Sequence, residues 1–272
     1  MKLVYDVGMH EGEDTEFYVK RGFKVVGIEA NPFLAEKLQN KFAPEISSGQ
    51  VRIVNKAIAA AAGTARMAVS ATQTVFSTLL DDYAQRSATS YHVDSSYVDV
   101  ECITFDEVLR EYGMPYFLKI DIEGSDMLCL EALQKFDTKP PYVSVESRAI
   151  APACGMRDVL AELRLLRNLG YSRFKYVNQA AIPGTTRHLD SEGPPMTYTF
   201  PTHSSGAFGA ESTGAWHSAP CAAVIGMALR IYEDTTGSGG RLYNAKGMWR
   251  VRQLRQRLTK HADYWFDLHA AQ

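Results

Sequence analysis

The sequence has little cysteine and lacks any long apolar run. Its four cysteines, Cys102, Cys129, Cys154 and Cys221, are far apart and form no CxxC pair. This spacing offers no zinc or redox motif and favours reduced structural thiols in a cytosolic protein. No stretch approaches the roughly 18 apolar residues of a membrane helix, and the N-terminus lacks the features of a signal peptide. We therefore expect a cytoplasmic location.

An excess of charge of one sign is also missing. The 272 residues include 29 Lys and Arg against 31 Asp and Glu, which gives a net charge of -2. No global basic field suggests a nucleic-acid partner, and no internal repeat is visible. With 46% hydrophobic and 22% charged residues, the chain suits one large α/β domain with a core of ordinary size.

Short apolar runs typical of buried strands alternate with amphipathic stretches. We expect strands at 3–7, 24–29, 51–56, 65–69, 97–103, 116–121, 142–146, 174–177 and 265–270. We expect helices at 14–21, 32–42, from 106, 126–133, 156–169, 219–233 and 246–260, and a loop at 85–96. The alternation predicts a Rossmann-like α/β fold, a doubly wound and mostly parallel seven-stranded sheet, with a large insertion before the last strand. Asn31 before Pro32 predicts a helix start, and Gly170 a helix end.

Residues 178–262 interrupt this alternation with turn motifs such as Pro183–Gly184 and Gly193–Pro195. We interpret the chain as one domain, 1–272, in which 178–262 forms a substrate-recognition insertion or lid. Its segment 246–260 has six basic residues and no acidic one. An amphipathic lid with a solvated basic face is the simpler interpretation. Recognition of an anionic substrate or contact with a membrane surface is the alternative.

Acidic residues mark the ends of four expected strands. They are Asp6, Glu29, Asp121 and Glu146. In open α/β sheets, ligands bind outside the carboxyl ends of the strands. We therefore expect these four side chains to converge on one ligand-binding edge.

The stretch DVGMHEG, from Asp6 to Gly12, places a glycine-containing turn between the first strand and the first helix, where a nucleotide can bind. The nearby acids Glu11, Glu13 and Asp14 would repel a polyphosphate, which rejects ATP and disfavours NAD(P). S-adenosylmethionine fits better, because it carries a sulfonium and an ammonium but no phosphate. Glu29 can accept hydrogen bonds from both ribose hydroxyls. The alternative is that Asp6 and Glu29 only cap helices or turns.

These motifs resemble those of the FkbM-type methyltransferases, a branch of the S-adenosylmethionine-dependent class I fold. The similarity covers roughly residues 3–150. The first motif, D-V-G-x-x-x-G-x-x-[ST], is matched by Asp6, Val7, Gly8, Gly12 and Thr15. The E-x-N-P motif is matched by Glu29, Asn31 and Pro32, and the K-x-D-x-E-G motif by Lys119, Asp121, Glu123 and Gly124.

The resemblance implies S-adenosylmethionine-dependent O-methylation of a hydroxyl on a small molecule such as a sugar, a lipid or a secondary metabolite. His10 stands where many relatives carry asparagine. The cofactor-binding residues that we carry over are Asp6, Gly8, His10, Gly12, Thr15, Glu29, Ala30, Asn31, Ala57, Ser77 and Asp121.

Methyl transfer needs the hydroxyl in line with the methyl group, and a positioned base assists it. Asp121 is the first candidate for the methyl-facing base and Glu146 the second. Asp121 could instead hold the ammonium of the cofactor, and Glu146 could be a polar strand end. Glu123 could cap the next helix.

Two histidines of the insertion, His203 and His217, could reach the substrate. Asp121, Glu146 and a histidine could together bind Mg²⁺, but no compact ligand motif is visible, so we assign no metal ligand and the metal requirement stays open. An NAD(P)-dependent oxidoreductase and a nucleoside-binding domain without catalysis are the alternative functions. The methyl acceptor and the oligomeric state stay open.

Overall fold

The computed structural model describes residues 1–70, 95–122, 124–151, 154–237, 240–242, 245, 248–250, 253 and 265–272. Within them the chain divides into two units. Unit 1 comprises Met1–Val143 and Gly193–Met196, and unit 2 comprises Ser144–Glu192 and Thr197–Gln272. The strands of the largest sheet follow the order β3-β2-β1-β7-β8-β12-β9. The predicted α/β fold with a seven-stranded sheet is therefore confirmed, and each unit is described by itself below.

Unit 1 contains the parallel strands that carry the first motif. β1 pairs in parallel with both β2 and β7, and β2 pairs in parallel with β3. These strands read as continuous apolar runs because the sheet is buried on both faces. Val4, Tyr5 and Val7, for example, are completely buried. The bounds are β1 Leu3–Val7, β2 Lys24–Ile28, β3 Val51–Val54 and β7 Phe117–Ile120.

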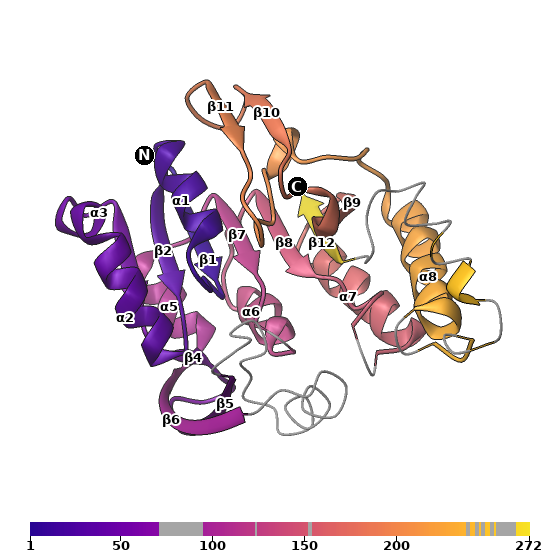
Figure 1. The fold of residues 1–272 in the computed structure, drawn as a ribbon, viewed down its shortest axis with the longest axis horizontal. Helices are drawn as coiled ribbons and strands as arrows, with labels where there is room; N and C mark the ends of the chain where they lie inside the picture. The colour runs from indigo at the N-terminus through magenta and orange to yellow at the C-terminus, as the bar shows by residue number, and fades with distance from the viewer. Residues whose placement is uncertain are drawn as a thin grey trace. The chain divides into compact units, whose positions relative to one another are not determined.

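Two helices of unit 1 have recognisable capping residues at their N-termini. The Asn31 side chain accepts a hydrogen bond from the N–H of Phe33, and Pro32 occupies the first turn, as the sequence indicated. Thr104 and Glu107 form a reciprocal capping box at the start of α5. Figure 1 shows α1 beside β1 and β2. The bounds are α1 Glu13–Lys20, α2 Pro32–Lys41, α3 Ala43–Ser47, α5 Phe105–Tyr112 and α6 Asp126–Leu133.

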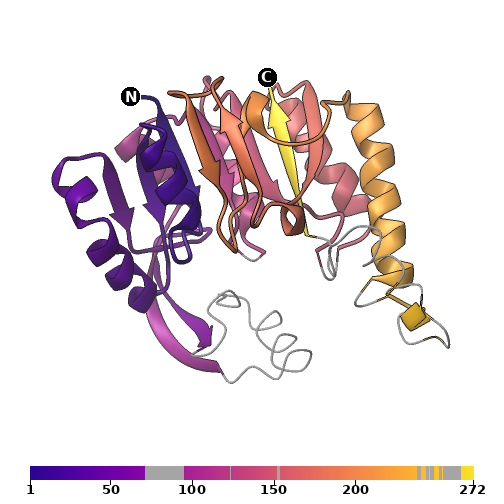
Figure 2. The same cartoon turned by 45° about the horizontal axis from the view of Figure 1, so that its top comes forward.

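Unit 1 also contains a second, three-stranded sheet with the strand order β4-β6-β5. Two of the strands expected from the sequence belong to it and not to the main sheet. They are β5 (Gly63–Ser70) and β6 (Ser95–Ile103), which pair antiparallel and form the curved ribbon of Figure 2. β4 (Ala57–Ile58) pairs in parallel with β6. The expected loop 85–96 is wrong at its end, because residues 95 and 96 begin β6, and its remainder lies outside the described residues.

Unit 2 contains the antiparallel pair β9 (Arg173–Asn178) and β12 (Phe266–Ala271), next to β8 (Tyr142–Glu146) in the strand order. α7 (Met156–Asn168) ends before Gly170, which adopts φ 98° as the predicted helix stop. α7 and the long α8 (Ala219–Thr236) lie side by side in Figures 1 and 2. Gly226 permits this approach, because a Cβ there would lie 2.8 Å from a methyl carbon of Val159.

The segment between β9 and β12 is the insertion expected from the sequence. It holds a hairpin of β10 (Thr186–Leu189) and β11 (Met196–Thr199), two short 3₁₀ helices at Gln179–Ala181 and Gly209–Glu211, and α8. The sequence analysis missed the hairpin, because its strands are only four residues long and no apolar alternation marks them. Most of 246–260 lies outside the described residues. The single-domain organisation and the lid role stay predictions.

Candidate functional site

The loop after β1 passes very close to the strand end of β7. Gly8 adopts φ 89°, and a Cβ on it would lie only 1.9 Å from the carbonyl oxygen of Asp121. The N–H of Asp121 donates to the carbonyl of Val7 over 2.9 Å. Gly12, at φ 78°, precedes α1, and a Cβ there would lie 2.7 Å from the ring of Phe42. The two glycines of the predicted motif are therefore required by backbone conformation and close packing.

A buried network of charges lies under this loop. Thr15 Oγ1 donates to Asp6 Oδ2 over 2.7 Å, and Lys119 Nζ donates to Asp6 Oδ1 over 3.2 Å and to the Gly8 carbonyl over 3.3 Å. Lys119 Nζ also lies 3.4 Å from Asp14 Oδ2. Burial raises the pKa of Asp6, against the opposing effect of the Lys119 ammonium. Asp6 and Thr15 are fully buried, and their hydrogen bonds stabilise the loop after β1.

Asp121 differs from its buried neighbours because its side chain keeps 26% of its surface exposed. It follows β7 directly, and its Oδ2 lies 3.9 Å from Lys119 Nζ. Burial raises the pKa of Asp121 to about 6, with Lys119 opposing and Asp126, Asp14 and Asp6 adding to the rise. The site thus presents a carboxyl group that changes its charge close to neutral pH.

Glu29 follows β2 and is held by two backbone donors. Its Oε1 accepts from the N–H of Asn31 over 2.8 Å, and its Oε2 accepts from the N–H of His10 over 3.0 Å. Burial raises the pKa of Glu29 to about 7, while these two donors and the charge of His10 oppose the rise. Asn55 donates to the carbonyls of Glu29 and Ala30, which fixes the turn behind the carboxylate.

His10 lies in the left-handed region at φ 53°. Its Nδ1 is 3.4 Å from Glu13 Oε1. Burial disfavours the imidazolium, but the hydrogen bond and charge of Glu13, with the charges of Glu11 and Glu29, raise the pKa of His10 above its usual value. Three of the four strand-end acids, Asp6, Glu29 and Asp121, therefore belong to one cluster in unit 1.

The other predicted residues have different surroundings. Ala57 is buried in β4 and packs with Met67, Val100 and Cys102, against which Ala30 also packs. Ser77 and Glu123 lie outside the described residues. For Ala30, Ala57 and Ser77, contact with a cofactor stays a prediction.

Sequence reasoning missed Asp126 as the residue that holds the turn after Asp121. Its Oδ1 accepts from the N–H of Ile122 over 3.1 Å, and its Oδ2 accepts from the N–H of Gly124 over 3.0 Å. The signal was available, because an acid at the start of a helix commonly bonds nearby backbone donors. The sequence analysis assigned a capping role to Glu123 instead.

Glu146 is the last residue of β8 and is 8% exposed, in unit 2. Its convergence with the acids of unit 1 stays a prediction. Two residues earlier on the strand, Ser144 donates to Asp267 over 3.1 Å and lies 3.3 Å from His269 Nε2. Burial lowers the pKa of His269 to about 3, so this imidazole is neutral at physiological pH. The sequence analysis did not identify this polar group.

The two histidines of the insertion, His203 and His217, lie in unit 2. His203 adopts φ 65°, and His217 forms a backbone bridge with Phe174 while its Nδ1 lies 3.5 Å from Cys221 Sγ.

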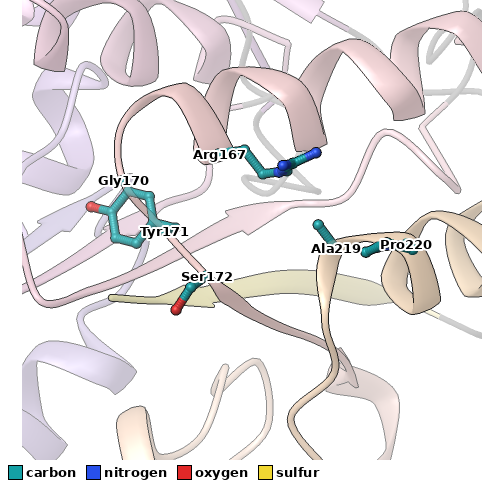
Figure 3. A pocket seen from close by; sticks show the side chains of 6 residues that line it. All are labelled: Arg167, Gly170, Tyr171, Ser172, Ala219 and Pro220. Atoms are coloured by element: carbon teal, nitrogen blue, oxygen red, sulfur yellow. The ribbon is translucent and has the colours of Figure 1, made fainter.

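Unit 2 also has a cavity of about 320 Å³ at the end of α7 and the start of α8 (Figure 3). None of the predicted site residues line this cavity. The lining residues are Arg167, Gly170, Tyr171, Ser172, Ala219 and Pro220.

Two further properties concern the described part of the chain. It contains no group of three or more His, Cys, Asp or Glu side chains that could hold a metal ion. No helix within it has the length and apolar character needed to cross a membrane. The four cysteines carry free thiols.

Comparison with known proteins places more than half of the chain in one family. Residues 6–173 match the family model described as the methyltransferase FkbM domain. A search of curated proteins found no significant match.

Several solved structures are similar at low sequence identity. They include precorrin-6Y C5,15-methyltransferase from Geobacter metallireducens, which is 11% identical in sequence. The alignment covers 73% of this chain and 74% of that chain, with a TM-score of 0.36. The C-terminal domain of the Rhodobacter capsulatus precorrin-6Y methyltransferase matches at 12% identity, 72% of this chain, 77% of that chain and a TM-score of 0.38. An rRNA methylase from Streptococcus thermophilus matches at 10% identity, 72% of this chain, 83% of that chain and a TM-score of 0.33. The family assignment rests on the family model alone.

Proposed function

From the premise that the chain belongs to the FkbM methyltransferase family and is an S-adenosylmethionine-dependent methyltransferase, we propose that it methylates a hydroxyl oxygen of a small molecule. When bound, S-adenosylmethionine supplies the methyl group. The family assignment stands against the oxidoreductase alternative. Transfer to oxygen, the choice of a sugar, lipid or secondary metabolite, the absence of a nucleic-acid partner and a cytoplasmic location remain proposals.

The carboxylates of unit 1 fit this cofactor. The loop after β1 and the strand ends beside it present carboxylates, Asp121 and Glu29 among them, together with Glu11 and Glu13. These charges favour a positively charged ligand and repel phosphate. In our proposal Glu29 accepts hydrogen bonds from the ribose hydroxyls, and the backbone of 8–12 lies against the methionine end.

Asp121 carries the proposal of transfer to oxygen. A hydroxyl is a poor nucleophile until its proton is removed, and a general base works best when its pKa lies near the operating pH. Asp121 has a partly exposed carboxyl group at a strand end, with its pKa raised to about 6. It can therefore be ionised at pH 7 and still accept a proton. Glu146 is the second candidate base, and binding of the cofactor ammonium is the competing role for Asp121.

Methyl transfer to identified atoms tests this proposal. The purified protein would be incubated with S-adenosylmethionine carrying a ¹³C-methyl group and a panel of hydroxylated sugars, lipids and secondary metabolites. We expect a new O-methyl signal in the NMR spectrum of one class of acceptor. A methyl group found only on nitrogen or carbon would contradict the proposal, and binding of the cofactor without any product would favour the non-catalytic alternative.

Variants then separate the two roles of Asp121. As a base, Asp121→Asn would lower kcat by about 100-fold or more with little change in cofactor affinity. If Asp121 instead binds the ammonium of the cofactor, the same substitution would mainly raise the Kd of the cofactor. Glu146→Gln tests the second candidate, and Asp137→Asn, at an exposed position, is the matched control. Wild-type kcat in Asp121→Asn with a loss in Glu146→Gln would move the base to β8.

A further inference from the structure

The unusual backbone of His10 is the starting point. A side-chain-bearing residue in the left-handed region is disfavoured by about 1–3 kcal/mol and persists only where its surroundings hold it. His10, at φ 53°, is held on two sides. Its N–H donates to Glu29 Oε2 over 3.0 Å, and its imidazole Nδ1 lies 3.4 Å from Glu13 Oε1. The conformation thus connects the start of α1 to the end of β2.

Glu29 is the acid that accepts the hydrogen bond from the N–H of His10. Each of its carboxylate oxygens accepts one backbone N–H, from His10 and Asn31, and the residue is 7% exposed. An ionised carboxylate has about four lone-pair sites, so acceptor capacity remains for a ligand. A protonated carboxyl has less of this capacity and carries no negative charge.

The charges that face this pair come from several elements. Glu11 precedes α1, Glu13 begins it, and Glu29 follows β2, and all three act on the imidazole of His10. Asp6 of β1 acts on Glu29. From α2, Lys41 Nζ donates to the carbonyl of Glu11 over 2.9 Å and lies 3.3 Å from Glu16 Oε2. The surroundings of His10 are therefore mainly acidic, which favours its protonated form.

We propose that His10 is a positioning residue for the ribose end of the cofactor: its N–H orients Glu29, and its imidazolium stabilises the ionised form of that carboxylate. This inference rests on the proposed function, in which the carboxylate of Glu29 accepts hydrogen bonds from the ribose hydroxyls. His10 itself acts through Glu29 and not on the reacting atoms.

The direction of the effect follows from the charges. Burial raises the pKa of Glu29 to about 7, and this value already includes the lowering by the charge of His10. Removing the positive charge of His10 raises the pKa of Glu29 further. Glu29 would then lose its ionised, ribose-accepting form at a higher pH than in the wild type. Well above both pKa values Glu29 is ionised with or without His10, so the difference should shrink as the pH rises.

His10→Asn is the variant that tests this role. Asparagine tolerates the left-handed region and keeps the backbone N–H that bonds Glu29, so only the titratable side chain is lost. His188→Asn is the matched control, because His188 lies exposed on β10 in unit 2. Calorimetry would give the Kd of S-adenosylhomocysteine between pH 6 and 8.5 for the wild type and both variants.

For His10→Asn we expect binding about threefold to tenfold weaker than for the wild type at pH 6.5, and a smaller difference at pH 8.5. His188→Asn should follow the wild type throughout. Adenosine and 2′-deoxyadenosine provide the second probe, since the deoxy analogue lacks one hydroxyl that Glu29 would bind. The preference of the wild type for adenosine at pH 6.5 should decrease in His10→Asn.

The outcomes distinguish this inference from the proposed function. If folded His10→Asn, checked by circular dichroism, shows the same pH profile as the wild type, the role of His10 is overturned while cofactor binding stands. The same holds if its affinity is reduced equally at every pH. If the wild type does not bind S-adenosylhomocysteine at any pH, the proposed function itself fails.

Discussion

Lys119 Nζ lies 3.2 Å from Asp6 Oδ1, and the two residues are 113 positions apart in the sequence. Both side chains are almost fully removed from solvent, with exposures of 6% and 0%. A buried charge pair of this kind contributes little net stability by itself, but removing one partner leaves the other charge uncompensated. The pair joins β7 to β1 below the loop that carries the first motif.

Lys119→Met should therefore destabilise the protein by about 3–5 kcal/mol, because Asp6 and Asp14 would lose their shared cation. Urea unfolding at pH 7 would measure the loss. Lys135→Met is the matched control. Its ammonium lies 3.0 Å from Asp106 but is 58% exposed, so the loss there should stay below about 1 kcal/mol. Equal losses in the two variants would contradict the role of Lys119.

Gly8→Ala should disrupt the loop after β1. The new Cβ would meet the Asp121 carbonyl at 1.9 Å, so the two strand ends must move apart. We expect a clear loss of thermal stability and at least about tenfold weaker binding of S-adenosylhomocysteine, since a small misplacement at such a site is costly.

Gly49→Ala separates the clash at Gly8 from the backbone preference. Gly49 has φ 74° but nothing within 4 Å of an added Cβ, so this variant should lose only about 1–2 kcal/mol. Its cofactor affinity should be unchanged. A Gly8→Ala protein that binds as well as Gly49→Ala would show that the close approach to Asp121 does not matter.

Asp121→Asn should be more stable than the wild type at alkaline pH. Folding raises the pKa of Asp121 to about 6, so the folded state favours the neutral carboxyl and loses stability as pH rises through 6. An amide has no charge to develop. We expect a gain of about 1–2 kcal/mol at pH 8, after allowing for the exposed part of the side chain, and almost none at pH 4. Thermal unfolding at both pH values would measure it, and an equal gain at pH 4 would refute this origin.

Asp126→Ala should destabilise the turn that follows Asp121. Two backbone donors, the N–H groups of Ile122 and Gly124, would lose their acceptor, at a cost of about 1–3 kcal/mol. Asp137→Ala, at an exposed position between α6 and β8, should change stability by less than about 0.5 kcal/mol. Hydrogen exchange at Ile122 and Gly124 would locate the effect. Unchanged protection there would mean that other contacts hold the turn.

Much of this arrangement could be predicted from local sequence. The apolar runs before Asp6, Glu29 and Asp121 mark buried parallel strands, and an acid at the end of such a strand falls on the edge where ligands bind. Asn31 with Pro32, and Gly170, mark helix ends through local hydrogen bonding and backbone preference. Each of these signals depends on a few neighbouring residues.

The remainder depends on partners that are distant in the sequence. Nothing near Asp6 indicates that Lys119 neutralises it, and nothing near Ser144 indicates the contact with Asp267, 123 residues away. The separate sheet of β4, β5 and β6 was missed as a sheet, because strand patterns specify faces and not neighbours. Such pairings follow from the topology once the fold is known.

The position of β12 has a consequence for how the protein is made. This strand lies between β8 and β9 in the strand order, yet the ribosome synthesises residues 266–271 after both of them. Until then, the facing edges of β8 and β9 have no strand to pair with, and unpaired edges promote association with other chains. Nascent chains halted before residue 266 should therefore depend strongly on chaperones, and a release of this dependence would mark the arrival of the last strand.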